Sequence, residues 1–341
     1  EIYTLSLHDA LPIYQPDCCM RKRLSLLALS LSVVMLVGAV AWGAPIRVGF
    51  VVPSTRDDLA WSQAMYEGIV AVQEELGSDK LELSISERLG NPVDAAAAIR
   101  QYASQGYDLI IAHGAQYQSL LNDIAPDFPK TTFAYGTGYA AKFPNIFAYD
   151  PHSQEGAYIG GVVAGMMTKS GVIGLVGPVE AGDAIKYNKG FEMGVKAVNP
   201  KAEVRIAYTG SFNDLVGAGE IARTAINAGA DFLSGSSQQS VGALKAVAEH
   251  KGVYWISTDL NMKNVAPESV LLAQVYLFKN VVREMLDSRA KGELGGRAIP
   301  LSIANGNIDI QINRELPPEV AQKVEEIKSD IASGKLKIEL N

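Results

Sequence analysis

The chain has 341 residues, of which 48% are hydrophobic and 20% are charged, and its formal net charge is −7. This balance is typical of a globular protein of two domains and excludes a disordered or membrane-embedded chain. The excess of acids gives no basic footprint for nucleic acid or for an anionic membrane surface, so we expect neither as a partner.

Residues 20–44 have the pattern of a secretory signal peptide. A basic start, Met20 to Arg23, is followed by an apolar run from Leu24 to Ala41. We therefore expect export to the periplasm. The apolar run is about long enough to span a bilayer, so an uncleaved membrane anchor is the alternative interpretation.

Residues 1–19 do not fit upstream of a signal peptide and resemble translated sequencing-adapter DNA, so we interpret them as an artefactual extension. Both cysteines of the chain, Cys18 and Cys19, fall in this segment. The sequence therefore predicts no disulfide, no cysteine-based metal site and no lipid-attachment cysteine after the apolar run. A free periplasmic protein is expected.

From residue 45 onward, short apolar runs alternate with longer helical patterns, which indicates parallel sheets built from βαβ units. Predicted strands begin near residues 46, 81, 109 and 131, and again near 172, 204, 231 and 253. The two sets have nearly the same spacing, which indicates two lobes of one topology. The predicted fold class is α/β: two Rossmann-like lobes with parallel sheets and a hinged interlobe cleft, the type I periplasmic binding protein fold.

The lobes are expected to be discontinuous in sequence. The N-terminal lobe is predicted to contain residues 45–148 and 260–298, and the C-terminal lobe residues 149–259 and 299–341.

Ligands of open α/β sheets bind beyond the carboxyl ends of the strands. Residues 56–68, R-D-D-L-A-W-S-Q-A-M-Y-E-G, follow the first predicted strand and place Trp61 on the rim of the expected cleft. The side chains after the strands are rich in aromatics, amides and hydroxyls and poor in cations, which favours a neutral, flat, hydrogen-bonding ligand over a phosphate or a dicarboxylate. The candidate ligand-binding residues are Asp58, Trp61, Ser62, Gln116, Phe212, Ser237, Gln238, Gln239 and Asp259.

Most of these residues also have a possible structural role. Trp61 and Phe212 could be core residues of their lobes instead of faces that sandwich a ring. Asp58 and Asp214 could cap the helices that follow them, and the two glutamines could only satisfy loop backbone groups. Asp259 ends a buried strand, where a carboxylate is costly without partners, which favours a ligand role.

Residues 57–68, D-D-L-A-W-S-Q-A-M-Y-E-G, are similar to the motif D-D-x-S-F-N-Q-x-x-W-E-G of the basic membrane protein family of ABC-transporter solute-binding proteins. The best-understood members of this family bind purine nucleosides. Further similar segments are E-G-A-Y-I-G-G-V-V-A-G (155–165), K-G-F-E-M-G-V-K-A-V-N-P (189–200), G-S-F-N-D (210–214) and the strand ending at Asp259. The resemblance extends over residues 46–341.

The resemblance implies a role for four residues. Trp61 takes the place of the first stacking phenylalanine, and Phe212 takes the place of the second. Asp259 would accept hydrogen bonds from ribose hydroxyls, and Asp58 would lie near the base or the hinge.

The chain departs from the family pattern at three positions. Ser62 replaces an asparagine, Gln238 replaces a glycine, and Tyr276 stands where a lysine that helps to hold the ribose is expected. Tyr276 is therefore added to the candidate ligand-binding residues. These departures make a free nucleobase, or another flat heterocycle contacted by Gln238, Gln239 and Tyr276, an alternative to a nucleoside.

We thus expect a periplasmic solute-binding protein of an ABC importer, with a purine nucleoside or nucleobase-like ligand between the lobes. Its partners would be that small molecule and an ABC permease in the inner membrane; it would be a monomer with no cofactor and no metal. The alternatives are a ligand-sensing subunit of a membrane receptor and a binding protein for a sugar or an amino acid. The helix N-terminus after Ser236 and Ser237 could hold the carboxylate of an amino acid.

An enzyme is not expected. The segment G-L-V-G-P-V-E-A-G (174–182) lacks the G-x-G-x-x-G spacing, and neither a G-x-S-x-G elbow nor a Walker-type loop is present. His113, His152 and His250 have no metal-ligand spacing; His113 is a candidate for lining the cleft, and the other two are expected at the surface.

Overall fold

The computed structural model describes residues 44–340. The predicted artefactual extension, both cysteines and the predicted signal peptide up to residue 43 lie outside the described residues. From Pro45 onward the chain forms one compact unit. No helix in the described part of the chain is long and apolar enough to cross a bilayer.

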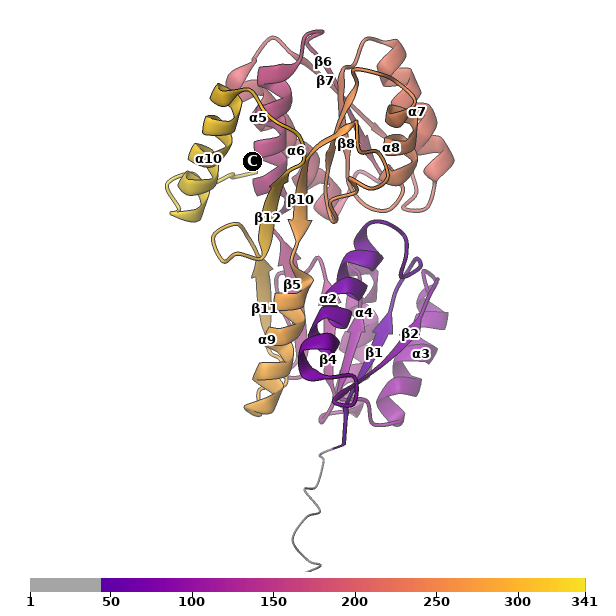
Figure 1. Cartoon of the computed structure of the whole chain (residues 1–341). Coiled ribbons are helices and arrows are strands. Elements are labelled where there is room, and N and C mark those ends of the chain that lie inside the picture. The colour runs from indigo at the N-terminus through magenta and orange to yellow at the C-terminus, as the bar shows by residue number, and fades with distance from the viewer. Residues whose placement is uncertain (1–43, 341) are drawn as a thin grey trace, which may run out of the picture. The chain divides into compact units, whose positions relative to one another are not determined.

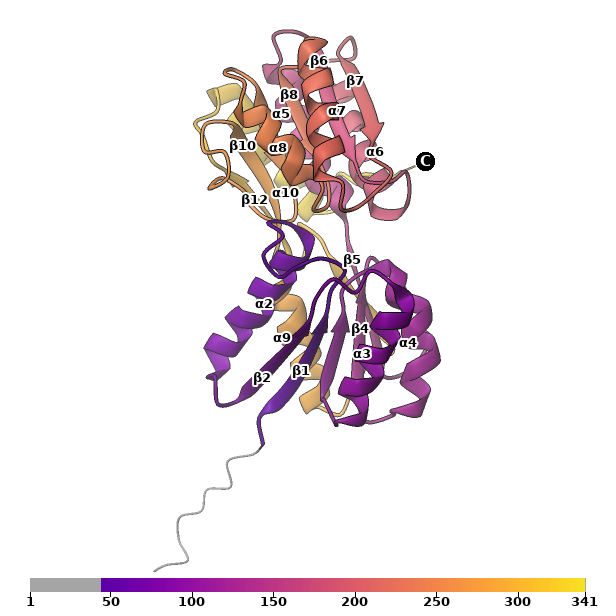
Figure 2. The ribbon, with the colours of Figure 1, turned by 90° about the vertical axis from the view of Figure 1, so that its right-hand side faces the viewer.

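The first lobe is built on a parallel sheet to which six strands within residues 44–340 contribute (Figure 1). The strands are β1 (Ile46–Val51), β2 (Leu81–Ser86), β3 (Leu109–Ala112), β4 (Thr132–Gly136), β5 (Ile146–Pro151) and β11 (Arg297–Leu301), in the spatial order β11-β5-β4-β3-β1-β2. Helices α2 (Trp61–Leu76) and α9 (Phe278–Ala290) lie on one face, and α3 (Pro92–Ser104) and α4 (Gln118–Ile124) on the other (Figure 2). Because both faces are covered, the inner strands are apolar throughout, as in Leu109–Ala112.

The second lobe repeats this architecture. Its strands are β6 (Val172–Gly177), β7 (Glu203–Tyr208), β8 (Phe232–Gly235), β9 (Tyr254–Ser257), β10 (Val270–Tyr276) and β12 (Ile308–Ile312), in the order β12-β10-β9-β8-β6-β7, with only β12 antiparallel to its neighbour among the described strands. Its helices are α5 (Ser153–Met167), α6 (Gly182–Val198), α7 (Leu215–Asn227), α8 (Ser240–Ala248) and α10 (Pro318–Ala332). The predicted strand starts agree with β1–β4 and β6–β9, and the two-lobed α/β fold class is confirmed.

Helices α5 and α6 pack unusually close because both carry glycine at the contact. A Cβ atom added to Gly161 would lie 2.0 Å from the carbonyl oxygen of Phe191, and one added to Gly194 would lie 2.0 Å from that of Tyr158. The glycine-rich segments 155–165 and 189–200 are therefore explained by helix packing. They fix the α5–α6 layer of the second lobe rather than a ligand.

The predicted lobe boundaries differ from the observed sheets at residues 149–151, 260–276 and 299–301. The chain passes between the sheets after β5, after β10 and between β11 and β12, so β10 belongs to the second sheet and β11 belongs whole to the first. Which sheet a buried apolar strand joins depends on pairing with residues far away in sequence; β10 pairs with β9 and β12. The three passages lie side by side at the hinge (Figure 1).

Candidate functional site

Backbone strain gathers at the carboxyl ends of the strands. The non-glycine residues with positive φ that follow strands are Leu59 after β1, Arg88 after β2, Thr137 after β4, Ser237 after β8, and Asp259 and Met262 after β9, with φ of 62°, 60°, 56°, 67°, 70° and 56°. Such conformations cost about 1–3 kcal/mol each and persist where the surroundings enforce them, often at ligand sites. The strain thus marks the strand ends at which the sequence places its ligand-binding candidates.

Asp259 is the clearest of these candidates. Its side chain is only 3% exposed, and Oδ2 has no hydrogen-bond partner. Burial raises the pKa of its carboxyl well above the ordinary value, and the nearby carboxylates of Asp183 and Asp58 raise it further. A buried carboxyl with an unmet oxygen is costly, so this atom is placed to receive a donor from a ligand.

Further unmet polar atoms surround the strand ends of the second lobe. Ser236 Oγ and Gln239 Oε1 follow β8, Ser257 Oγ ends β9, and Asn188 Oδ1 lies on α6 beside the end of β6. All four side chains are buried. The amide oxygens only accept hydrogen bonds, so together with Asp259 they suit a ligand that presents N–H or O–H groups.

Trp61 begins α2 and is partly buried. Its indole stacks on the imidazole of His113 with the ring centroids 4.1 Å apart and an angle of 10° between the planes. It also meets the ring of Tyr276 from the second lobe edge-on, at 6.2 Å and 85°. Trp61 thus packs in part against the first-lobe core while it contacts a candidate residue of the other lobe.

Asp58 caps α2. Its Oδ1 accepts hydrogen bonds from the backbone N–H groups of Ala60 and Gln63, and its Oδ2 accepts one from that of Ser62. The capping role is therefore confirmed for Asp58. Burial raises the pKa of this carboxyl, while the backbone donors act in the opposite direction.

The turn before α2 also contacts the second lobe. Ala60 is fully buried in an apolar cluster that includes Ala218, Leu244 and Met262 of the second lobe, and Leu59 packs against the same cluster. This contact brings the segment from Asp58 to Trp61 against the strand ends that carry Asp259.

The remaining predicted residues lie in different surroundings. Tyr276 is buried at the end of β10, and its hydroxyl accepts hydrogen bonds from Gln274 Nε2 and Thr258 Oγ1. Phe212 is 45% exposed at the turn between β7 and α7, and Gln116 is exposed after β3. Among the described residues, no ring contact joins Phe212 to Trp61.

Gln239 is engaged with its own loop, and Gln238 with the turn before α7. Gln239 Nε2 donates to the carbonyl oxygen of Ser236 at 2.9 Å, and Gln238 Nε2 donates to Asn213 Oδ1 at 3.2 Å. The carbonyl oxygen of Ser237 accepts a hydrogen bond from Ser240 Oγ. Gln239 thus satisfies a loop backbone group, whereas Gln238 binds a side chain, and Gln239 Oε1 remains without a partner.

The sequence did not single out Lys186 at this site, and it gave His113 a different place. Lys186 on α6 binds Asp150 at 2.8 Å and Asp183 at 3.0 Å and so carries an ion pair from one lobe to the other. The i, i+3 spacing from Asp183 to Lys186 was the available signal. His113 is fully buried beneath Trp61 instead of lining the cleft with a free imidazole.

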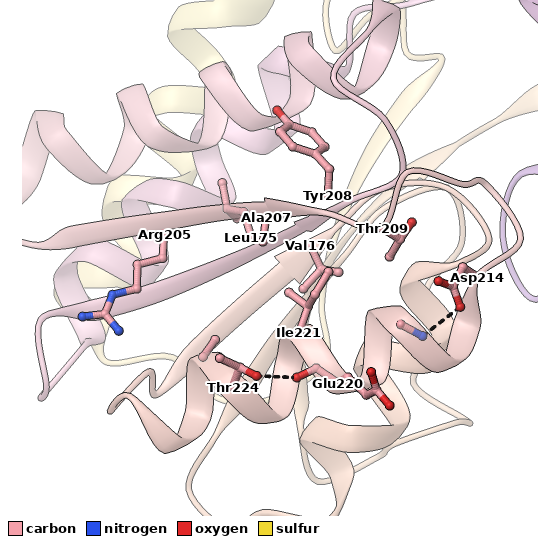
Figure 3. Close-up of a pocket in the computed structure, with 12 residues that line it drawn as sticks. Leu175, Val176, Arg205, Ala207, Tyr208, Thr209, Asp214, Glu220, Ile221 and Thr224 are labelled. Atoms are coloured by element: carbon pink, nitrogen blue, oxygen red, sulfur yellow. Dashed lines mark hydrogen bonds between the residues drawn. The ribbon is translucent and has the colours of Figure 1, made fainter.

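Figure 3 shows a cavity of about 500 Å³ between β7 and α7. None of the ten predicted ligand-binding residues lines it. Its polar groups are used within the protein, since Asp214 caps α7 through the N–H of Gly217 and Arg205 pairs with Glu203. The unmet polar atoms at the strand ends therefore make the better candidate site. The described residues contain no cluster of histidine, cysteine and carboxylate side chains suited to a metal.

Two α/β lobes joined by three chain passages, with strained residues and unmet polar atoms at the strand ends, define a two-lobed ligand-binding protein. The chain belongs to the family of ABC transporter substrate-binding proteins described as PnrA-like, which it matches over residues 46–341. The family resemblance of the sequence is thus confirmed. The family consists of extracytoplasmic solute-binding proteins, not enzymes, which bind small molecules and work with a permease.

Two curated relatives are 26% identical to the chain. One is a purine-binding protein of Brucella abortus, matched over 302 residues that cover 89% of this chain and 85% of the relative. The other is a candidate ABC transporter glucose-binding protein of Haloferax volcanii, matched over 289 residues that cover 85% of this chain and 72% of the relative.

A solved structure supports the fold. It is an ABC transporter solute-binding protein of Aeropyrum pernix K1, which is 20% identical, has a TM-score of 0.76 and covers 87% of this chain and 94% of its own.

Proposed function

We propose that the protein binds a purine nucleobase or nucleoside between its lobes and delivers it to an ABC importer through an inner-membrane permease. The observation that carries the proposal is the unmet Oδ2 of buried Asp259, at the strand ends against which the segment from Asp58 to Trp61 packs. Purines present N–H groups at the edge of a flat ring. Such a ligand would meet the acceptors while its face stacks on an aromatic side chain, a contact worth about 1–3 kcal/mol.

The contact set of the proposal is drawn from the ten residues that the sequence predicts. Trp61 and Phe212 would stack on the ligand, and Asp259 with Tyr276 and Gln239 would bind its polar edge. Phe212 would move from its exposed turn onto the ligand. Asp58 would act by shaping the turn, because its oxygens already accept three backbone N–H groups.

Charge supports an uncharged or cationic ligand over a nucleotide. The carboxylates of Asp58 and Asp183 act electrostatically on Asp259, and the ammonium group of Lys186 is paired with Asp183 and Asp150. A phosphate would be repelled by these carboxylates. The second candidate is a sugar, because hydroxyl groups could also donate to the unmet oxygens and one relative is named for glucose.

Thermal unfolding and calorimetry on the purified protein test the proposal. The panel would contain adenine, guanine, hypoxanthine, adenosine, inosine, AMP, D-glucose and D-ribose. A purine present at 100 times its dissociation constant should stabilise the protein by about 2.7 kcal/mol, and AMP should bind far more weakly than adenosine. If glucose or ribose binds and no purine does, the sugar candidate replaces the proposal.

Transport needs a separate test. Cells that lack the gene should lose uptake of the radiolabelled purine that binds best, and the wild-type gene should restore uptake. Unchanged uptake together with a lost transcriptional or motility response to the same purine would favour the sensing alternative.

A further inference from the structure

His113 and Trp61 form a reciprocal pair. His113 directly follows β3, and Trp61 is the first residue of α2. The indole Nε1 donates to the carbonyl oxygen of His113 at 3.3 Å, while Nε2 of the imidazole lies 2.8 Å from the carbonyl oxygen of Trp61. Together with the parallel stacking of the rings at 4.1 Å, these contacts hold the indole from its face and from its edge.

The hydrogen bonds fix which nitrogen of His113 carries the proton. A carbonyl oxygen can only accept, so Nε2 must be the N–H donor to Trp61. Burial lowers the pKa of His113 to about 3, so the ring is neutral and Nδ1 is an acceptor. Nδ1 lies 2.6 Å from the hydroxyl of buried Tyr149, which therefore donates to it. A chain of directed hydrogen bonds thus runs from Tyr149 through His113 to the start of α2.

The surroundings leave the indole little freedom. Phe278 meets both His113 and Trp61 edge-on, at 5.3 Å and 5.4 Å with planes at 85°. A Cβ atom at Gly136 would lie 2.9 Å from Cζ2 of Trp61, so the absence of a side chain there makes room for the indole. The imidazole covers one face of the indole, and no other ring in the described part of the chain stacks on it.

We propose that His113 is a positioning residue that sets the ring plane of Trp61 and leaves the opposite indole face for the ligand. A ring that is already fixed loses little conformational freedom when a ligand stacks on it, which improves affinity. The positioning is a property of the empty protein, and only its effect on affinity rests on the proposed function.

The empty protein tests the positioning directly. The difference between the near-ultraviolet circular dichroism of the wild type and of Trp61→Phe gives the band of Trp61. His113→Leu should remove most of this band, whereas His113→Gln, whose amide can still donate to the carbonyl oxygen of Trp61, should keep part of it. A folded His113→Leu variant that retains the full band would overturn the proposal.

Two Tyr→Phe variants, each of which removes one buried hydroxyl group, test the positioning role if His113→Leu does not fold. Tyr149→Phe removes the donor to Nδ1 of His113, and Tyr135→Phe removes another buried hydroxyl of the same lobe, which donates to Ala140 and accepts from Gln118. The Trp61 band should weaken in Tyr149→Phe and stay unchanged in Tyr135→Phe. Equal bands in both variants would count against the role of His113.

A double-mutant cycle measures the effect on ligand binding. With whichever purine of the panel binds, His113→Leu should weaken affinity about ten-fold in the wild-type background and have almost no effect in Trp61→Ala, because the two residues act through one ring. Losses that simply add would show that His113 acts independently of Trp61. If no purine binds, the proposed function fails, while the dichroism of the empty protein still decides the positioning.

Discussion

The ammonium group of Lys186 lies 2.8 Å from Oδ1 of Asp150, and this contact joins α6 of the second lobe to β5 of the first. The same Nζ lies 3.0 Å from Asp183 Oδ1 and 2.9 Å from the carbonyl oxygen of Pro151. Burial lowers the pKa of Lys186, but the two carboxylates raise it by more, so the lysine stays charged. One side chain thus ties the lobes together beside the first hinge passage.

Lys186→Met should lower the free energy of unfolding by about 2 kcal/mol, because it leaves two partly buried carboxylates facing each other without a cation. Urea denaturation at low salt measures the loss. Lys323→Met is the control: it removes an exposed lysine that pairs with Glu326 within one helix, and should change stability by less than about 0.5 kcal/mol. Equal losses in the two variants would show that the interlobe ion pair does not contribute to the free energy of unfolding.

The close packing of α5 and α6 predicts a larger loss of stability at one helical glycine than at another. Gly161→Ala should destabilise by about 1–3 kcal/mol, because the new Cβ would lie 2.0 Å from the carbonyl oxygen of Phe191 and the helices must separate. Gly219→Ala on α7 should change stability much less, since the nearest atom to its Cβ, the carbonyl oxygen of Gly242, is 3.3 Å away and needs to shift only slightly, while alanine favours helix. Thermal unfolding measures the stability of both variants. A Gly161→Ala variant as stable as the wild type would contradict the prediction.

Much of the fold was predictable because local pattern and global fold agree over most of the chain. Buried parallel strands are short apolar runs between helical patterns, and β1–β4 and β6–β9 follow that rule. β5, β10, β11 and β12 did not stand out, since they lie at the lobe passages where the regular alternation of strand and helix breaks down. Their sheet membership depends on long-range pairing, which the order of residues does not encode locally.

The candidate site was predictable in position but not in the state of each side chain. The rule that ligands bind at strand ends located Asp259 and Trp61 without coordinates. The sequence could not show that the carboxylate of Asp58 accepts hydrogen bonds from backbone N–H groups. Helix capping and ligand binding both favour an aspartate just before a helix that follows a strand. The sequence also did not show that His113 packs against Trp61, since this contact joins residues 52 positions apart in the chain.

Phe212 separates the stacking proposal from a core role. Phe212→Ala should leave the stability of the unliganded protein within about 0.5 kcal/mol of wild type, because the ring is 45% exposed. It should weaken the binding of a purine by about 1–3 kcal/mol if the ring stacks on the ligand. Calorimetric titration beside thermal unfolding distinguishes the two effects; unchanged affinity would remove Phe212 from the contact set.

His113 should make the protein acid-sensitive. Its pKa is about 3 in the folded state because the ring is buried, against about 6.5 in the unfolded chain. Below pH 6.5 His113 binds a proton in the unfolded state but stays neutral in the folded state. The free energy of unfolding therefore falls as pH falls, by up to about 1.4 kcal/mol per pH unit. His113→Gln should lose this contribution. Urea denaturation at pH 4.5 and 6.5 should show a wild-type loss about 2 kcal/mol larger than that of the variant.

Asp259 should act in the opposite direction. Burial, with the charges of Asp183 and Asp58, raises its pKa well above the ordinary value. Above pH 4 the folded state keeps a proton that the unfolded state has lost, so the stability that this group contributes falls as pH rises through the folded pKa. Asp259→Asn is neutral at every pH, so it should gain stability relative to the wild type as pH increases from 5 to 8.

The same substitution should weaken purine binding, because an amide oxygen accepts hydrogen bonds less strongly than a carboxylate. Denaturation and calorimetric titration of Asp259→Asn at pH 5 and pH 8 measure both effects. Asp309→Asn is the control, since Asp309 is a partly buried carboxylate on β12 that accepts a hydrogen bond from Gln311. It should neither gain stability between pH 5 and pH 8 nor weaken purine binding. If Asp259→Asn is more stable than the wild type at pH 8 but binds the purine less tightly, the buried carboxyl serves ligand binding and destabilises the fold. A variant that loses stability at every pH would instead make Asp259 a structural residue.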